Sequence, residues 1–251
     1  MRYLILSDIH SNWEALTAVL VHVRRKQFDR VVFLGDAVGY GASPNQIVGW
    51  LRGLGRHAAV VRGNHDRVCS GLDSSEYFNR YAREAAEWTL ENLDPQNLDF
   101  LRKTTVGPLE VTPELAICHG SAIDEDAYIF SAYDANLAFE ALDHRVIFFG
   151  HTHVPSLFAL GGDPDPSSLA VKLLAGRRMT IDLEEGKRYL INPGSVGQPR
   201  DRDPRAAYGI YDENEARFHL YRVNYRMAMA RHRIMQAGLP PVLGDRVLYG
   251  A

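Results

Sequence analysis

The stretch Phe148-Phe149-Gly150-His151-Thr152-His153 decides how this chain of 251 residues is interpreted. It is an apolar run that ends in a glycine and is followed by two histidines one residue apart. A strand that stops there would hold both imidazoles at its carboxyl end, and the single spacer lets both rings turn toward one centre. Two histidines are too few for a metal site, so the other ligands must come from elsewhere in the chain.

Four earlier apolar runs end in the same way. Each is short and continuous, which is the pattern of a strand buried on both faces. The runs cover residues 3–6, 31–34, 58–61 and 115–118, and they are followed by Asp8 and His10, by Asp36, by Asn64 and by His119. In open α/β sheets, ligands collect at the carboxyl ends of the strands, so this regularity predicts one shared site.

The chemistry of these groups favours two transition-metal ions. Carboxylate, amide and imidazole ligands favour Mn, Fe, Zn, Co or Ni, and the excess of nitrogen disfavours Mg or Ca. Seven groups are too many for one tetrahedral ion, but they suit two ions about 3.5–4 Å apart that share a carboxylate. Because Asp8 and Asp36 are the only anions among them, two dications would keep a positive charge that suits a phosphate ester.

Between and after these runs, several segments have the composition or periodicity of helices. They cover residues 12–26, 43–54, 74–101, 134–142 and 225–236. Ser11 or Asn12 can cap the first helix, and Ser43-Pro44 can begin the second. No strand pattern interrupts the third segment, so we expect a helical insertion or cap at about 70–105.

Beyond His153 the pattern changes to strands without helices between them. These strands cover residues 170–174, 178–183, 189–192, 207–211 and 218–223, and they predict a second, largely antiparallel sheet. We therefore expect residues 1–251 to form a single α/β domain. Its architecture would be a four-layer αββα sandwich of two mixed β-sheets flanked by helices, with the cap-like segment added. The Gly-, Pro- and Asp-rich residues 161–168 predict an exposed loop.

Composition disfavours several other classes of protein. With a net charge of −3, the chain shows no basic face that would mark nucleic acid as its main partner. Charged residues interrupt every apolar run well short of the roughly 20 residues that a membrane span needs. The first residues lack the pattern of a signal peptide, and the two cysteines, Cys69 and Cys118, suit a reducing compartment. We expect a cytoplasmic protein without a membrane partner; the sequence makes no prediction of its oligomeric state.

Taken in order, the metal-binding groups resemble the five motif blocks of the calcineurin-like metallophosphoesterases. The blocks are Asp8-Ile9-His10, Gly35-Asp36-Ala37-Val38-Gly39, Gly63-Asn64-His65-Asp66, His119-Gly120 and Gly150-His151-Thr152-His153. The later stretch Asn192-Pro193-Gly194-Ser195-Val196-Gly197-Gln198-Pro199-Arg200 is similar to a block of small bacterial members, including the YfcE-like phosphodiesterases. The resemblance thus covers most of the chain.

The resemblance implies an αββα sandwich, a binuclear metal centre and phosphoester hydrolysis. It implies that one ion is held by Asp8, His10, Asp36 and His153, and that the other is held by Asp36, Asn64, His119 and His151. Attack on phosphorus by a hydroxide that bridges the two ions is implied as well, and manganese is the ion we expect to support activity. His65 matches the family's non-ligand histidine, which protonates the leaving oxygen, and Asp66 would orient its ring and raise its pKa.

Three positions, Gly39, Tyr40 and Asp66, depart from the serine/threonine phosphatase branch of this family. That branch carries Gly-Asp-x-Val-Asp-Arg-Gly and Gly-Asn-His-Glu, whereas here Tyr40 replaces the arginine that grips phosphate and Asp66 replaces the glutamate. Substrate oxygens would instead meet Tyr40, Arg62, Arg200 or Arg202, although the charged residues 200–205 also fit a solvated loop.

The departures give a slight preference to a phosphodiesterase acting on a small-molecule or nucleotide phosphate ester. A phosphomonoesterase, a protein phosphatase and a dinucleotide polyphosphate hydrolase stay open as alternatives. So does a non-catalytic binding scaffold on the same fold, although a scaffold would predict an eroded ligand set.

Overall fold

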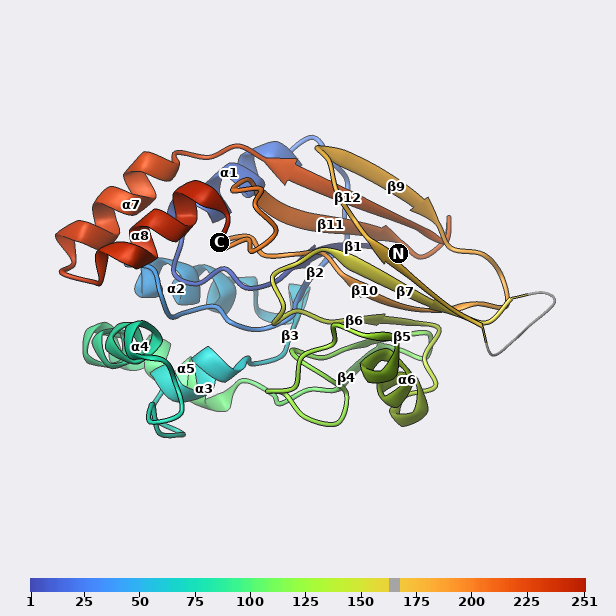
Figure 1. The fold of residues 1–251 in the computed structure, drawn as a ribbon, viewed down its shortest axis with the longest axis horizontal. Coiled ribbons are helices and arrows are strands. Elements are labelled where there is room, and N and C mark those ends of the chain that lie inside the picture. Colours follow the sequence, from blue (N-terminus) through green and yellow to red (C-terminus); the bar gives the residue numbers. More distant parts are fainter. Residues whose placement is uncertain (163–167) are drawn as a thin grey trace.

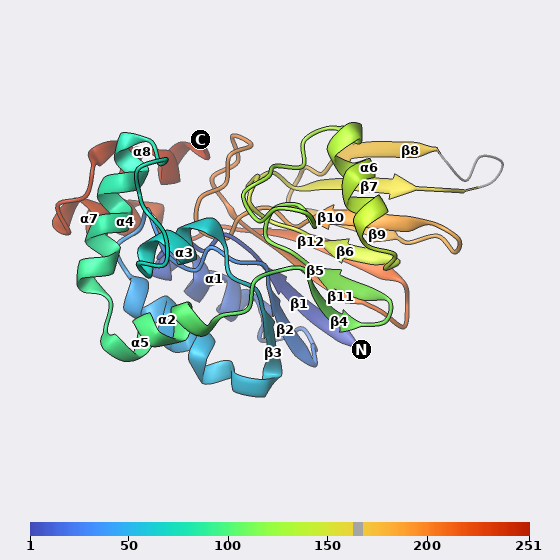
Figure 2. The ribbon, with the colours of Figure 1, turned by 90° about the horizontal axis from the view of Figure 1, so that it is seen from below.

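The computed structural model describes residues 1–162 and 168–251. Two β-sheets lie against each other in the middle of the molecule, and helices cover their outer faces (Figures 1 and 2). The expected α/β fold of two mixed sheets flanked by helices is therefore confirmed. The loop expected at residues 161–168 falls largely outside the described residues.

Each sheet has six strands. In spatial order the first sheet contains β3 (Ala58–Val60), β2 (Arg30–Phe33), β1 (Arg2–Leu6), β11 (Ala206–Asp212), β12 (Arg217–Val223) and β9 (Arg178–Asp182). The second sheet contains β4 (Leu109–Thr112), β5 (Leu115–Ile117), β6 (Val146–Phe148), β10 (Arg188–Asn192), β7 (Ser156–Leu160) and β8 (Leu169–Leu173).

The helices occupy the outside of the sandwich and one of its ends (Figure 1). They are α1 (Trp13–Val23), α2 (Pro44–Leu54), the 3₁₀ turn η1 (Gly55–His57), α3 (Asn64–Cys69), α4 (Arg80–Asn92), α5 (Pro95–Lys103), α6 (Ala132–Ala141), α7 (Met227–Gln236) and α8 (Pro241–Tyr249). As expected, Asn12 caps α1, where its side chain accepts a hydrogen bond from the backbone N–H of Ala15 at 3.0 Å.

The prediction that the later strands form a sheet of their own is wrong. Strands β11, β12 and β9 extend the first sheet, because β11 pairs antiparallel with β1. Strands β10, β7 and β8 extend the second sheet, because β10 pairs parallel with β6. Each sheet therefore contains both parallel and antiparallel pairs. The sequence could not predict this, because an apolar run indicates that a strand is buried but not which sheet edge it joins.

Some elements differ from the sequence prediction in number. The segment 74–101, predicted to be helical, contains two helices, since only two residues separate the end of α4 from Pro95, which begins α5. Strands β4 and β7 and the last helix, α8, were not predicted. These elements are short, and α8 begins at the second residue of the pair Pro240-Pro241, a pattern that is also common after the end of a helix.

Alternate residues of the inner strands face different cores, which explains their continuous apolar sequences. In β1, Leu4 and Leu6 belong to the core that includes α1 and α2, whereas Tyr3 and Ile5 belong to the core between the two sheets. In β6, Phe148 lies in this central core, while the neighbouring Ile147 packs in the core beneath α6.

The register of the strands brings their ends to one level. Leu6, Phe33 and Val60 are neighbours across β1, β2 and β3, and Ile117 is paired with Phe148 across β5 and β6. The loops that carry the candidate ligands therefore leave both sheets at the same end of the sandwich. Within the described residues, we find no helix whose length and apolar character would allow it to cross a membrane.

Candidate metal centre

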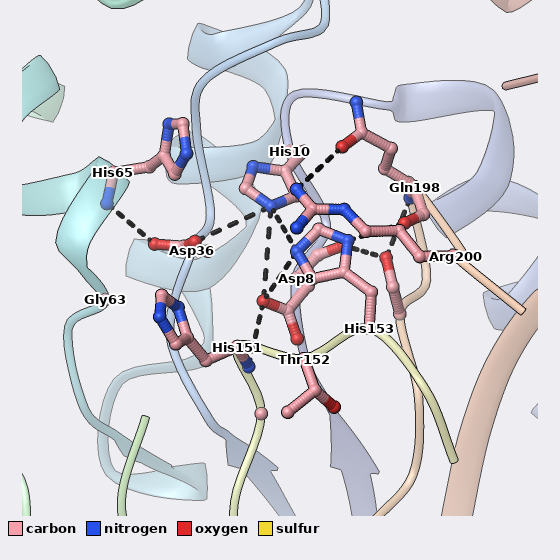
Figure 3. A network of polar contacts seen from close by, with 12 residues as sticks. Asp8, His10, Asp36, Gly63, His65, His151, Thr152, His153, Gln198 and Arg200 are labelled. Carbon is pink, nitrogen blue, oxygen red and sulfur yellow. Dashed lines mark hydrogen bonds and ion pairs between the residues drawn. The ribbon is translucent and has the colours of Figure 1, made fainter. Parts of the chain in front are cut away.

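The structure brings the candidate ligands together between the ends of the two sheets (Figure 3). One ligand atom from each of four residues lies within 4.8 Å of the others, and these residues are Asp8, His10, Asp36 and His153. A second group of the same kind consists of Asp36, His119 and His151, so that the Asp36 carboxylate belongs to both. The side-chain oxygen of Asn64 lies 3.2 Å from Nε2 of His119, next to the second group.

The backbone at the candidate ligands is unusual. Five of them have positive φ angles: Asp8 (51°), His10 (47°), Asp36 (57°), His151 (63°) and His153 (60°). This left-handed region costs a residue with a side chain roughly 1–3 kcal/mol, and such residues cluster at functional sites. Tyr40 adjoins them with a φ of 57°. The strain indicates that the chain gives up stability to turn these side chains toward a common centre.

Two glycines allow the loops to approach the carboxylates. A Cβ atom on Gly63 would lie closer than 3.0 Å to the carboxylate of Asp36. One on Gly150 would collide with Oγ of Ser7 and lie 3.0 Å from the carboxylate of Asp8. The residues that precede Asn64 and His151 must therefore be glycines, because the site leaves no room for a side chain at either position.

Backbone carbonyls fix the orientation of the first two histidines. Nδ1 of His10 lies 2.9 Å from the carbonyl oxygen of Val38, and Nδ1 of His119 lies 2.8 Å from that of Leu34. A carbonyl oxygen can only accept a hydrogen bond, so Nδ1 of each ring carries a proton. The Nε2 atom, which faces the candidate site, is then free to offer a lone pair to a metal.

The two histidines that follow β6 are held in the same way but through different ring atoms. Nδ1 of His153 lies 2.5 Å from the carbonyl oxygen of Gln198, whereas in His151 it is Nε2 that lies 3.0 Å from the carbonyl oxygen of Asp126. His153 thus presents Nε2 to the first group, and His151 presents Nδ1 to the second. The single spacer Thr152 separates two rings that serve different groups.

The electrostatics of the site are dominated by buried carboxylates. Burial raises the pKa of Asp8 above the usual range of an aspartate. Burial acts on Asp36 in the same direction, but the neighbouring His119 outweighs it and holds the pKa of Asp36 well below its usual value. Burial also disfavours the charged form of His119, yet the Asp36 carboxylate raises the pKa of His119 to about 10. The carboxylates therefore demand positive charge beside them.

The residues present fit a pair of divalent metal ions. The Oδ2 atoms of Asp8 and Asp36 are buried and, among the described residues, have no hydrogen-bond partner. A buried carboxylate oxygen without a partner is costly unless a cation lies beside it. With two carboxylates, one amide oxygen and four imidazole nitrogens, the donor set suits Mn, Fe, Zn, Co or Ni.

His65 and Asp66 lie at the same site but are not paired as expected. The carboxylate of Asp66 accepts hydrogen bonds from the backbone N–H groups of Val38, at 3.2 Å, and Gly63, at 3.0 Å. Burial lowers the pKa of His65 well below its usual value, opposite to the direction expected. Asp66 thus holds the loop after β2 against the start of α3, and it positions His65 through the backbone only.

The ring of His65 borders the candidate centre instead of facing into it. Its centroid lies 4.9 Å from that of His10, 4.4 Å from that of Tyr40 and 4.5 Å from that of Phe78. Nδ1 of His65 is buried and has no hydrogen-bond partner in the described part of the chain. The ring is therefore close to the centre, and its buried Nδ1 atom faces the backbone of Gly39 without making a hydrogen bond to it.

The four residues expected to bind substrate occupy different environments. Arg200 is partly buried and donates a hydrogen bond to the Tyr40 hydroxyl at 3.3 Å. It donates another to the side-chain oxygen of Gln198 at 3.2 Å (Figure 3). Its positive charge contributes to the lowered pKa values of His10, to about 4, and of His153, although burial is the larger cause in both. Arg200 and Tyr40 therefore lie together at the metal centre.

The other two arginines are placed differently. Arg62 is bound to Glu125, with its guanidinium 2.9 Å from that carboxylate. Arg202 is exposed on a loop and makes a backbone hydrogen bond of 2.8 Å to Gly250. Neither arrangement brings its guanidinium into the two ligand groups.

The stretch 192–200 is a framework for the site. The Asn192 amide donates hydrogen bonds to the carbonyl of Gly150 at 2.7 Å and to the hydroxyl of Thr152 at 3.0 Å. The hydroxyl of Ser195 donates to the carbonyl of Asp8 at 2.7 Å. These contacts tie the loop after β6 to the loop after β1. The sequence indicated this block but not its role.

A further set of residues at the site had no sequence signal. Glu125 joins Arg62 and Arg67 and thereby holds residues 120–130 over the second ligand group. The Tyr128 ring stacks on His151, with centroids 4.0 Å apart and planes at 22°. Isolated charged and aromatic residues in a loop carry no periodicity, so their place at the centre emerges only from the fold.

Comparisons with known proteins agree with this fold and this pattern of residues. The sequence model described as the calcineurin-like phosphoesterase superfamily domain matches residues 1–216. An uncharacterised protein of Methanocaldococcus jannaschii is 36% identical over 247 residues, which cover 98% of this chain and 97% of that protein.

Two solved structures share the whole architecture. The crystal structure of a metallophosphoesterase from Sphaerobacter thermophilus is 38% identical, has a TM-score of 0.86 and matches 100% of this chain and 99% of its own. A hypothetical protein from Pyrococcus horikoshii has a TM-score of 0.79 over 100% of this chain and 98% of its own, at 16% identity. The latter likeness shows the fold alone.

Proposed function

Because this chain belongs to the calcineurin-like phosphoesterase superfamily, we propose that it is a metal-dependent hydrolase of phosphate esters that uses two divalent ions. The ligand assignment follows the two groups described above, with Asp36 shared. Manganese is the ion that we expect to support activity. Such ions, when bound, would polarise a phosphoryl oxygen and lower the pKa of a coordinated water.

The observation that carries this proposal is the shared carboxylate of Asp36. His10 and His119 approach its Oδ2 atom from opposite groups, at 3.5 and 3.4 Å. A carboxylate that lies between two sets of imidazole side chains is the arrangement that a binuclear centre needs. With a single ion, one of the two sets would have no ion to bind.

Residues outside the ligand set would handle the substrate. We assign the substrate's phosphoryl oxygens to Arg200, since its guanidinium lies beside the first group and is shared only with the neutral Tyr40 and Gln198 in the hydrogen bonds that the structure describes. We assign the protonation of the leaving oxygen to His65, whose ring borders the centre. Because burial lowers the pKa of His65, this role requires the negative charge of the bound phosphate to keep the ring protonated. Asp66 would act as a positioning residue for His65.

The proposal also specifies whether the substrate is a phosphodiester or a phosphomonoester. Tyr40 occupies the position at which the phosphatase branch has an arginine, so fewer positive charges are available for a phosphomonoester dianion. A phosphodiester monoanion needs less charge, which favours a phosphodiesterase acting on a small-molecule or nucleotide ester. In this account the chain is a single domain, and the segment with α4 and α5 borders the substrate cleft.

The proposal is tested by hydrolysis assays after chelation. The protein is stripped of metal, supplied with Mn²⁺ or another divalent ion, and assayed with bis-p-nitrophenyl phosphate and with p-nitrophenyl phosphate. We expect metal-dependent turnover, with the diester hydrolysed more efficiently. Failure to hydrolyse either ester with any of the ions would reject the enzyme assignment and favour a binding scaffold.

A further inference from the structure

A cavity of about 380 Å³ opens directly onto the second ligand group. Of the residues that line it, His151 belongs to that group and Asn64 lies next to it. The opposite walls come from the loop before α4, through Tyr77 and Phe78, and from the segment 120–130, through Tyr128. Its volume is within the range of small-molecule sites, and a phosphoryl group at the centre would direct its organic substituent into this space.

Aromatic side chains are exposed around this cavity without a structural reason. Tyr77 is 92% exposed, and Tyr128 is 44% exposed although its inner face stacks on His151. Phe130, which is 62% exposed, continues the stack outward, with its ring 5.2 Å from that of Tyr128 and the planes at 14°. The rings of His151, Tyr128 and Phe130 thus stack one on another from the metal site outward, and such a surface is suited to another planar ring.

The charges around the cavity are already paired. Among the described residues that line it, Arg67 carries the one positive charge, and its guanidinium contacts Asp126 at 2.6 Å and Asp73 at 3.0 Å. Arg67 also contacts Glu125, which Arg62 approaches at 2.9 Å. Two arginines therefore meet three carboxylates, so the wall offers little attraction to a polyphosphate chain or an acidic peptide.

We propose that Tyr77 and Tyr128 form a subsite that selects phosphate esters carrying a planar aromatic group, such as a nucleobase or an aryl ring. The uncharged ring stacks on the tyrosines while the phosphoryl group lies at the metal centre. The inference rests on the proposed phosphoesterase function and specifies the substrate class of that site. Tyr77 and Tyr128 are specificity-determining residues that take no part in proton transfer.

The test uses ligands that cannot be hydrolysed. Phenylphosphonate, cyclohexylphosphonate and methylphosphonate share one head group, and their affinities for the Mn²⁺-loaded protein are measured by calorimetry. We expect phenylphosphonate to bind about tenfold more tightly than methylphosphonate, and more tightly than cyclohexylphosphonate, because a ring face is recognised in addition to apolar area.

The variants identify the residues that are responsible. Tyr77→Ala should bring the phenyl-to-methyl affinity ratio to within about twofold of one and leave methylphosphonate binding unchanged. Tyr128→Ala should reduce the same ratio, with the metal content measured because this ring touches His151. Tyr133→Ala is the matched control, since Tyr133 is 71% exposed on α6 and is not among the residues that line the cavity.

The outcomes separate the subsite from the reaction. Equal affinities for the three phosphonates in the unaltered protein, or an affinity ratio that survives both Tyr77→Ala and Tyr128→Ala, would overturn the subsite even if bis-p-nitrophenyl phosphate is hydrolysed. Selective binding of phenylphosphonate that depends on the tyrosines would support the subsite even if no ester is turned over, and that result would count against the enzymatic function alone.

Discussion

His10 and His153 face each other across the candidate centre with their Nε2 atoms 3.1 Å apart, although 143 positions separate them in the chain. Since the Nδ1 atom of each ring is committed to a carbonyl oxygen, two lone pairs point at one another in a buried space. A proton or a metal ion placed between the nitrogens relieves this repulsion, and because burial lowers the pKa of both His10 and His153, a metal ion is the cation that we expect at their pair. Nε2 of His119 also lies 3.1 Å from Nδ1 of His151, but there, despite burial, the Asp36 carboxylate raises the pKa of His119, so this ring can donate a proton to its neighbour when no metal ion is bound.

The close approach of Gly63 to Asp36 predicts that a single methyl group will disable the centre. In Gly63→Ala the new Cβ must displace the Asp36 carboxylate, so we expect metal affinity to fall for both groups. Gly49→Ala on α2 is the control, because a Cβ there meets no atom within 4 Å and alanine should stabilise the helix by about 0.5–1 kcal/mol. Metal titrations and urea unfolding of both variants check this; normal metal binding by Gly63→Ala would contradict the geometry.

The placement of Arg200 predicts a role in substrate binding. Arg200→Ala should lower kcat/KM by roughly 10- to 100-fold, the effect of losing a charge-assisted hydrogen bond, while the two metal ions remain bound. Arg202→Ala removes an exposed arginine from the same loop and should change kcat/KM by less than about twofold. Steady-state kinetics on bis-p-nitrophenyl phosphate compare the two variants. Equal losses would show that the loop contributes only its overall charge.

The position of His65 predicts a variant that binds metal without turning over. His65→Ala leaves every proposed ligand in place, so the metal content should be unchanged while kcat falls by about 10²- to 10⁴-fold. His232→Ala, at an exposed position on α7, is the matched control and should retain full activity. The assay should use an alkyl ester, whose poor leaving group depends most on protonation. An unchanged rate in His65→Ala would exclude the acid role.

Glu125 predicts a pH dependence of stability that is separate from the metal ions. Burial raises the pKa of Glu125, but its hydrogen bonds to Arg62 and Arg67 outweigh this effect and lower the pKa in the folded protein. The stabilisation is therefore complete above the usual glutamate range and is lost as the pH falls through the lower, folded value. Glu125→Gln should cost about 1 kcal/mol of unfolding free energy at pH 7 and less at pH 3.

Urea unfolding of the chelated protein at the two pH values measures this difference. Glu84→Gln, which breaks the exposed pair with Arg80 on α4, is the control and should cost no more than a few tenths of a kcal/mol at either pH. If the Glu125→Gln difference were the same at pH 3 and pH 7, the carboxylate would not be the source of the stabilisation.

The strand-end residues could be located from the sequence because their signal is local. His151 and His153 directly follow a buried run, as do Asp36 and His119, and the ends of neighbouring parallel strands must meet. The two-sheet fold was predicted from the change of pattern after His153 and from the family resemblance, but the strands were divided wrongly between the sheets. The edge that β11 would join was not predictable, because a strand buried along its whole length fits an open edge of either sheet.

What the sequence did not predict depends on contacts between distant loops. The hydrogen-bond partners of Asp66 are the backbone N–H groups of Val38 and Gly63, and no pattern of side chains predicts such partners. Glu125 and Tyr128 reach the centre only because the segment after β5 folds back over it. Such residues are recognisable only after the backbone is known.

The most direct test of this account is the number of metal ions bound per chain in three proteins. After chelation and dialysis against Mn²⁺, elemental analysis of the unaltered chain should give two ions. His153→Ala and His151→Ala should each retain about one, because the two histidines serve different groups that share Asp36. A single ion in the unaltered chain, or two ions retained in either variant, would contradict the binuclear centre.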